Sequence, residues 1–182
     1  MQLSIQDFKS QLASGGVRPT MFECEVQLPT NNQNVNPGKN NQDIRQFTFL
    51  CKSTIIPGSM VTNLTLGLPA GGALKLPGSR IFEPWQATII CDGEMAQRRM
   101  FEQWNESVIG YENQRGAQFL SDYMSVATVH QLDRQGERLR SYEMRHVYPL
   151  VLSPMQLDYE ARDKIHYFDV QFVYHYFAPR QK

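Results

Sequence analysis

The stretch FTFLCKSTIIPGSMVTNLTLGLPAGGALKLPGSRIFEPW, residues 47–85, determines how the rest of the chain is interpreted. It reads as a strand, a break at Pro57 and Gly58, a long hairpin over residues 58–77, a second break at Gly78 and a closing strand. The order of these segments predicts a β-rich domain from which a two-stranded arm extends.

The arm predicted over residues 58–77 is unusually apolar, and Lys75 is its single charged side chain. A two-stranded ribbon is only marginally stable alone in water, and exposed apolar strands invite pairing with another chain. We therefore expect the arm to dock on a partner, and we expect that partner to be a second copy of the same chain. The side chains expected to pack between subunits are Met60, Leu64, Leu66, Leu68, Leu74 and Leu76.

Length and charge limit the classes of function. The chain has 182 residues, which suits one domain over residues 1–182, and it carries 18 Lys and Arg against 18 Asp and Glu. Affinity for nucleic acid comes largely from Lys and Arg contacts to phosphate, so a neutral chain is a poor candidate for tight DNA binding.

No apolar run approaches the roughly 20 residues that a transmembrane helix needs, and no signal peptide is visible, so we expect a protein made and used in a cytoplasm. Cys24, Cys51 and Cys91 are far apart in the sequence and lie in apolar strand patterns. An odd count without CxxC spacing predicts buried free thiols rather than disulfides or a zinc site.

The segments before the hairpin are predicted as an arm, a strand and a loop. Residues 1–17 form an N-terminal arm in which Leu3, Phe8 and Leu12 share one face of a short helix. A strand follows in which Phe22, Cys24, Val26 and Leu28 alternate with Glu23, Glu25 and Gln27. Residues 29–43 are a polar insertion whose composition suits a surface loop.

One strong helix is predicted after the hairpin, over residues 93–108, with Asp92 as its N-cap and Glu94 in its first turn. Its apolar stripe is predicted to pack in the core and consists of Met100, Phe101, Trp104 and Val108. A hairpin over 123–148 and a last strand follow, and that strand is expected to place Phe168, Val170, Phe172, Tyr174 and Tyr176 on one face. The fold class predicted is mainly β: a β-sandwich or barrel-like domain with one flanking α-helix and a long extended hairpin.

Catalytic, cofactor and metal motifs are absent from the sequence. The histidines are His130, His146, His166 and His175, and no pair has HExxH spacing. Three of them, His146, His166 and His175, can meet across adjacent strands, although strand histidines are usually structural. No GxSxG motif or nucleotide-binding glycine loop is present. We therefore predict no enzyme activity, no cofactor and no metal site.

Several segments resemble one family in their order and spacing. These segments are Arg18-Pro19 with Phe22; Phe47 and Phe49 with Cys51, Thr54, Pro57 and Val61; Gly78, Arg80, Phe82 and Trp85; Phe101 with Trp104; and Tyr148-Pro149, Leu157-Asp158 and Phe168-Asp169-Val170. Together, over residues 18–177, they resemble the tail tube proteins of contractile-tailed bacteriophages. The insertion at 29–43 looks longer than the compact connection of that family.

The resemblance implies a structural virion protein with the phage tail tube fold. Six copies are expected to form a ring with a continuous inner β-barrel, and the rings are expected to stack into the inner tube of a contractile tail. The implied partners are the tail sheath protein, a baseplate tube initiator and a tape measure protein in the lumen. DNA is expected to pass during genome ejection without specific binding, and no stable membrane insertion is expected. Assembly is expected in the host cytoplasm.

Other functions remain open at this stage. A tube initiator of the baseplate would share the fold and would stay as isolated rings. A type VI secretion-like tube ring would also share the fold. A monomeric ligand-binding β-barrel would instead present a concave apolar pocket. An enzyme would need a convergent polar constellation with perturbed pKa values.

Overall fold

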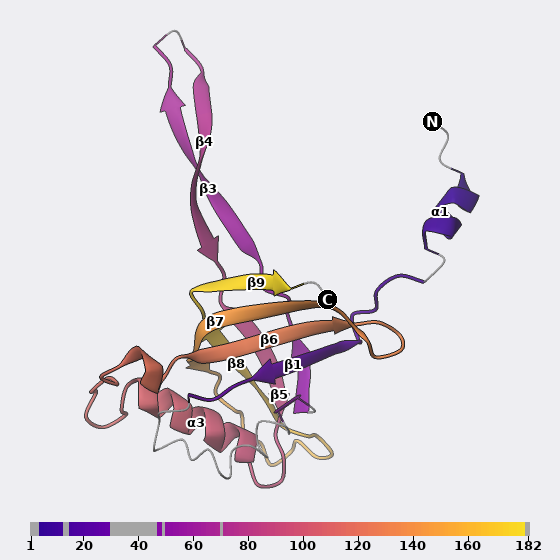
Figure 1. Cartoon of the computed structure of the whole chain (residues 1–182). Helices are drawn as coiled ribbons and strands as arrows, with labels where there is room; N and C mark the ends of the chain where they lie inside the picture. The colour runs from indigo at the N-terminus through magenta and orange to yellow at the C-terminus, as the bar shows by residue number, and fades with distance from the viewer. Residues whose placement is uncertain (1–3, 13–14, 30–46, 49, 70, 181–182) are drawn as a thin grey trace.

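The computed structural model describes residues 4–12, 15–29, 47–48, 50–69 and 71–180 (Figure 1). Strands predominate, which confirms the predicted mainly β fold class. The elements are α1 (Ile5–Gln11), β1 (Phe22–Val26), β2 (Cys51–Thr54), β3 (Ser59–Gly67), β4 (Ala73–Phe82), β5 (Trp85–Ile90), α3 (Ala96–Val108), the 3-10 helix η1 (Leu120–Asp122), β6 (Ser125–Leu132), β7 (Arg138–Leu152), β8 (Tyr167–Val173) and β9 (Tyr176–Arg180).

The long strand β7 belongs to two sheets and joins them. Its first half pairs with β6 on one side and β9 on the other, in a sheet of order β1-β6-β7-β9 that we call sheet A. Its second half pairs with β8 in a sheet of order β7-β8-β5-β2 that we call sheet B. Between the halves, His146 has a left-handed backbone with φ 58°. The strand therefore changes sheet at His146, as at the corner of a sandwich.

Aromatic side chains fill the core where α3 meets β8. Trp85 stacks on Phe172 with ring centroids 4.7 Å apart, and Phe101 of α3 meets the edges of Phe168 and Phe172. The Trp104 side chain has no exposed surface and donates from Nε1 to the Tyr123 carbonyl oxygen at 2.7 Å. Buried side chains of sheet A, such as Val129, belong to the same cluster, so one core holds both sheets and the helix together.

The helix α3 begins three residues later than the sequence predicts, at Ala96 rather than at residue 93. Met95 precedes it in a left-handed conformation with φ 52°, which prevents the helix from extending back toward Glu94. Met95 occupies the N-cap position predicted for Asp92, and the Asp92 side chain caps the helix from three residues further back, where its Oδ1 accepts from the Ala96 N–H at 2.8 Å. Arg98 and Glu102, four residues apart on α3, form an ion pair at 2.6 Å.

Removing this cap gives a direct test of the helix start. Asp92→Ala is expected to lower the free energy of unfolding by about 1 kcal/mol, because the Ala96 N–H loses its acceptor. Asp92→Asn keeps a side-chain oxygen and is expected to stay close to wild type. Urea unfolding followed by far-ultraviolet circular dichroism measures both, and equal losses in the two variants would show that the contact does not cap the helix.

Two strand predictions are wrong in detail. Residues 47, 48 and 50 are helical rather than extended, and β2 begins only at Cys51. Phe47 is nevertheless buried, and its ring packs edge-on against Phe101 with ring centroids 5.7 Å apart. Phe49 and the polar insertion from residue 30 onward lie outside the described residues.

The last strand is also divided. The sequence predicts one strand through Tyr176, whereas β8 ends at Val173 and β9 starts at Tyr176 in the other sheet. The His175 N–H donates to the Arg145 carbonyl at this turn. Phe168, Val170, Phe172 and Tyr174 are buried as predicted, and Tyr176 is 41% exposed because it lies past the break.

The N-terminal helix and the cysteines follow the sequence pattern in part. Ser4 and Asp7 form a capping box at the start of α1, and the apolar side chains of this helix, Phe8 and Leu12 among them, are exposed. Cys24 and Cys51 are buried free thiols, and Cys91 is only half-buried. Among the described residues, no helix combines the length and the apolar character needed to cross a membrane.

Candidate functional site

The strands β3 and β4 form an arm that projects away from both sheets (Figure 1). Near its tip, Leu64 pairs with Leu76 and Leu66 pairs with Leu74 across the two strands. Directly paired residues point to the same face of a two-stranded ribbon, so the four leucines form one apolar face, which we call the leucine face. They are 59%, 39%, 53% and 48% exposed in that order.

The opposite face of the arm is more polar, because Thr65 pairs there with Lys75. A single chain has nothing to cover the leucine face among the described residues. A two-faced ribbon of this kind has the amphipathic character of a sheet that needs a partner on one side.

A register shift divides the arm into two halves. The shift lies between Val61 and Asn63, and below it Met60 pairs with Ile81. β3 advances two positions from Val61 to Asn63 while β4 advances three from Pro77 to Arg80, so the extra residue, a β-bulge, lies in β4. The alternation of β3 is not interrupted, and Met60 lies on the same side of β3 as Leu64 and Leu66. Gly78 does not end the strand as predicted. β4 runs through it to Phe82, and a Cβ on Gly78 would meet the Thr62 Oγ1 at 2.5 Å.

All six side chains predicted to pack between subunits are exposed. Four form the leucine face, Met60 lies below the bulge on the same side of β3, and Leu68 lies in the turn at the tip, where its N–H donates to the Gly72 carbonyl at 3.1 Å. The sequence pattern identifies the arm but not the bulge that separates Met60 from the leucine face, because the register shift has no sequence signal.

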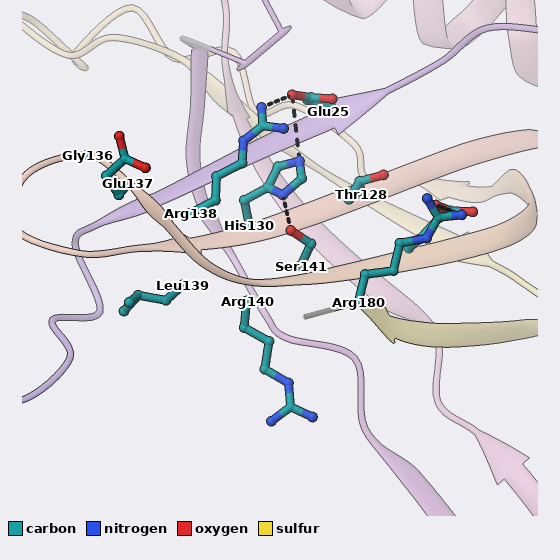
Figure 2. A pocket seen from close by; sticks show the side chains of 11 residues that line it. Glu25, Thr128, His130, Gly136, Glu137, Arg138, Leu139, Arg140, Ser141 and Arg180 are labelled. Atoms are coloured by element: carbon teal, nitrogen blue, oxygen red, sulfur yellow. Dashed lines mark hydrogen bonds and ion pairs between the residues drawn. The ribbon is translucent and has the colours of Figure 1, made fainter. Parts of the chain in front are cut away.

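The outer face of sheet A carries ion pairs that link neighbouring strands. Arg138 of β7 contacts Glu23 at 2.7 Å and Glu25 at 2.5 Å, both on β1. Glu143 is divided between Arg145 at 2.7 Å and Arg180 of β9 at 2.7 Å. We call these six residues the charged face, and Figure 2 shows the part that surrounds Arg138.

His130 lies beneath Arg138 and is 5% exposed. Its Nδ1 is 2.6 Å from the Ser141 Oγ, and its Nε2 is 3.6 Å from a Glu25 oxygen (Figure 2). Burial and the nearby Arg138 charge lower the pKa of His130, so the ring is neutral at pH 7.

The same group contains potential metal ligands. Donor atoms of Glu23, Glu25 and His130 lie within 4.8 Å of one another. Both carboxylates are already bound by the Arg138 guanidinium, which supplies the positive charge that a metal ion would bring. The arrangement is that of a salt-bridge network rather than of a metal centre.

The three strand histidines considered from the sequence do not converge. His146 and His175 lie close together at the corner of β7, with ring centroids 4.9 Å apart. Among the described residues, no group of metal-ligating side chains contains either of them or His166.

The charged face could be foreseen only in part. The alternation in residues 22–28 places Glu23 and Glu25 on a polar face, and the sequence of β7 is rich in arginine. The sequence does not say that Arg138 lies opposite these two glutamates, because the register between β1, β6 and β7 is a tertiary property.

Solved structures from contractile injection systems share this fold. A chain in the sheath–tube complex of the PVC extracellular contractile injection system superposes with a TM-score of 0.61, at 14% identity and over 100% of both chains. A chain in the baseplate of the anti-feeding prophage gives 0.66 at 8% identity, over 91% of this chain and 96% of that one. The fold is therefore one found in contractile injection systems.

The chain belongs to the phage tail tube protein family, whose model matches residues 17–179. The tail tube protein gp19 of Enterobacteria phage T4 is 24% identical over 174 residues, which are 94% of this chain and 98% of gp19. The gp19 of phage T6 matches to the same extent. The protein is thus a structural component of a phage tail, and the resemblance noted in the sequence is confirmed.

Proposed function

We propose that six copies of this chain close into a ring through sheet A and that the rings stack into the inner tube of a contractile tail. The observation that supports this proposal is that sheet A has two free edges. β1 pairs only with β6 and β9 only with β7 among the described residues, and each edge strand is five residues long.

Strand direction favours closure into a ring. The four strands of sheet A are antiparallel throughout, so β1 and β9 run in opposite directions. A rotation about the ring axis places a second copy beside the first without reversing its strands. β1 of the second copy then runs antiparallel to β9 of the first, and the ladder of backbone hydrogen bonds can continue. Closure also removes edges that would otherwise promote aggregation.

The volume of the subunit favours one face of sheet A as the face that points inward. Sheet B and α3 share one core with the inner face of sheet A, so the bulk of each copy lies on that side. The interior of a closed barrel cannot hold sheet B and α3 of six subunits, so these parts must lie outside the barrel. The charged face would then line the lumen.

The arm suits the contacts between successive rings. Stacking is a head-to-tail contact that does not close, so it extends a filament. The leucine face gives the arm an apolar surface to bury on a neighbouring copy, and Met60 and Leu68 would contact the surfaces on either side of it. The solved neighbours include sheath–tube and baseplate assemblies, which supports a tail sheath protein and a baseplate tube initiator as partners.

The remaining parts of the proposal follow from the tube. A tape measure protein would occupy the lumen during assembly in the host cytoplasm, and DNA would pass later during ejection. The protein would act without catalysis, without a cofactor and without stable membrane insertion. A tube initiator of the same fold is the second candidate, and it would form rings that do not stack.

Negative-stain electron microscopy of the purified protein over a range of concentrations tests the proposal. Hollow tubes made of stacked rings are expected. Rings that never stack would instead support the tube initiator, and particles that remain monomeric in the presence of a baseplate template would contradict both.

A further inference from the structure

We infer that the glutamates of the charged face keep its arginines from binding DNA, so that the lumen wall lets double-stranded DNA pass without retaining it. This inference rests on the proposed ring, which places the charged face in the lumen. It assigns a function to Glu23, Glu25 and Glu143 that depends on their partners rather than on net charge alone.

The arginines are within reach of a molecule in the lumen. The side chains of Arg138, Arg145 and Arg180 are 47%, 45% and 60% exposed. An arginine guanidinium can bind phosphate oxygens in the same two-pronged way as it binds carboxylates. Without their partners, they would be the contacts that hold DNA.

The carboxylates accept hydrogen bonds from the guanidinium nitrogens that would otherwise bind phosphate. Arg138 donates from Nε and Nη2 to Glu23, and Nη2 also contacts Glu25. Glu143 binds Arg145 through one oxygen and Arg180 through the other. Phosphate would have to displace these carboxylates and would meet their negative charge, so each arginine is a weak phosphate site.

The sixfold repeat of a ring multiplies the effect of each arginine that loses its carboxylate partner. If one arginine in each of six copies were released, a ring would offer about six phosphate contacts to DNA. That number of contacts makes affinity strong at low salt and lowers it by about 10³-fold between 50 and 200 mM salt. The paired face avoids such retention.

The test compares double-stranded DNA binding by wild type, Glu23→Gln/Glu25→Gln and a matched control. The control, Glu102→Gln/Glu106→Gln, changes net charge equally on α3 and releases Arg98 from its pair with Glu102. The protein is mixed with a fluorescent DNA duplex before assembly, and anisotropy is measured from 50 to 200 mM salt. The face variant is expected to bind at 50 mM and to lose about 10³-fold in affinity by 200 mM, while wild type and control stay unbound.

A third variant isolates the arginine. Adding Arg138→Gln to Glu23→Gln/Glu25→Gln is expected to abolish the gained binding. If thermal unfolding shows that Glu23→Gln/Glu25→Gln is destabilised, Glu143→Gln replaces it, since this change frees Arg145 and Arg180. The inference is overturned if the face variants gain no affinity, if the control gains as much, or if wild type binds equally well.

Electron microscopy of the same samples separates this inference from the ring. Tubes without a gain of binding in the face variants would overturn the inference alone. Absence of rings in wild type, even in the presence of a baseplate template, would overturn the proposed function and the lumen placement with it.

Discussion

Leu64→Asp is expected to abolish the stacking of rings into tubes while leaving the domain folded. Leu64 is 59% exposed on the leucine face, and a substitution at such a site changes the free energy of unfolding by only about 0.5 kcal/mol or less. In the tube the same position would be buried against a neighbouring copy. An unpaired carboxylate there costs about 3 kcal/mol or more, which raises the concentration needed for assembly at least 100-fold.

The arm itself provides the control. Thr65→Asp introduces the same charge one residue away, on the opposite face beside Lys75, and is expected to assemble close to wild type. Sedimentation measures the assembled fraction, and circular dichroism confirms that both variants are folded. Normal tubes from Leu64→Asp, or equal loss from Thr65→Asp, would show that the leucine face is not a contact between copies.

The parts of the fold that the sequence predicts well are those with strict local periodicity. The alternation of Cys24 and Val26 with glutamates predicts β1, and the spacing of Phe101 and Trp104 predicts the buried side of α3. In both cases one face is buried and the other is polar, so the pattern itself carries the information.

The errors occur where tertiary context overrides a local pattern. The alternation through Tyr176 gives no sign that the chain leaves sheet B after Val173, because both halves remain apolar on alternate residues. Residue 47 looks like part of a strand because it is apolar, whereas its burial comes from packing on Phe101 in a helical segment. Hydrophobicity predicted that Phe47 is inside but not its backbone conformation.

The candidate site shows the same division. The hairpin is visible in the sequence because an exposed ribbon with Lys75 as its single charged side chain is unusually apolar. The bulge in β4 that separates Met60 from the leucine face depends on how the two strands pair, and the charged face depends on which strands lie side by side. Contacts between residues more than 100 positions apart, such as Glu23 with Arg138, leave no local pattern to read.

Trp104→Ala is expected to cause the largest loss of stability among the changes considered, about 3–5 kcal/mol in the free energy of unfolding. Trp104 has no exposed surface, and its ring contacts Phe101 and Phe172, which connect α3 to β8. Alanine leaves a cavity at this junction and an unsatisfied carbonyl at Tyr123.

A second substitution divides the effect into its two causes. Trp104→Phe keeps an aromatic ring in the core but removes the Nε1 donor. This variant is expected to lose about 1–3 kcal/mol in the free energy of unfolding, because the Tyr123 carbonyl is left unpaired and the ring is smaller. Urea unfolding of both variants gives the two free energies. A loss below about 1 kcal/mol for Trp104→Ala would mean that α3 does not pack on β8 through this side chain. Because neither change touches the leucine face, the fraction of either variant that remains folded should still assemble, whereas Leu64→Asp should stay folded without assembling.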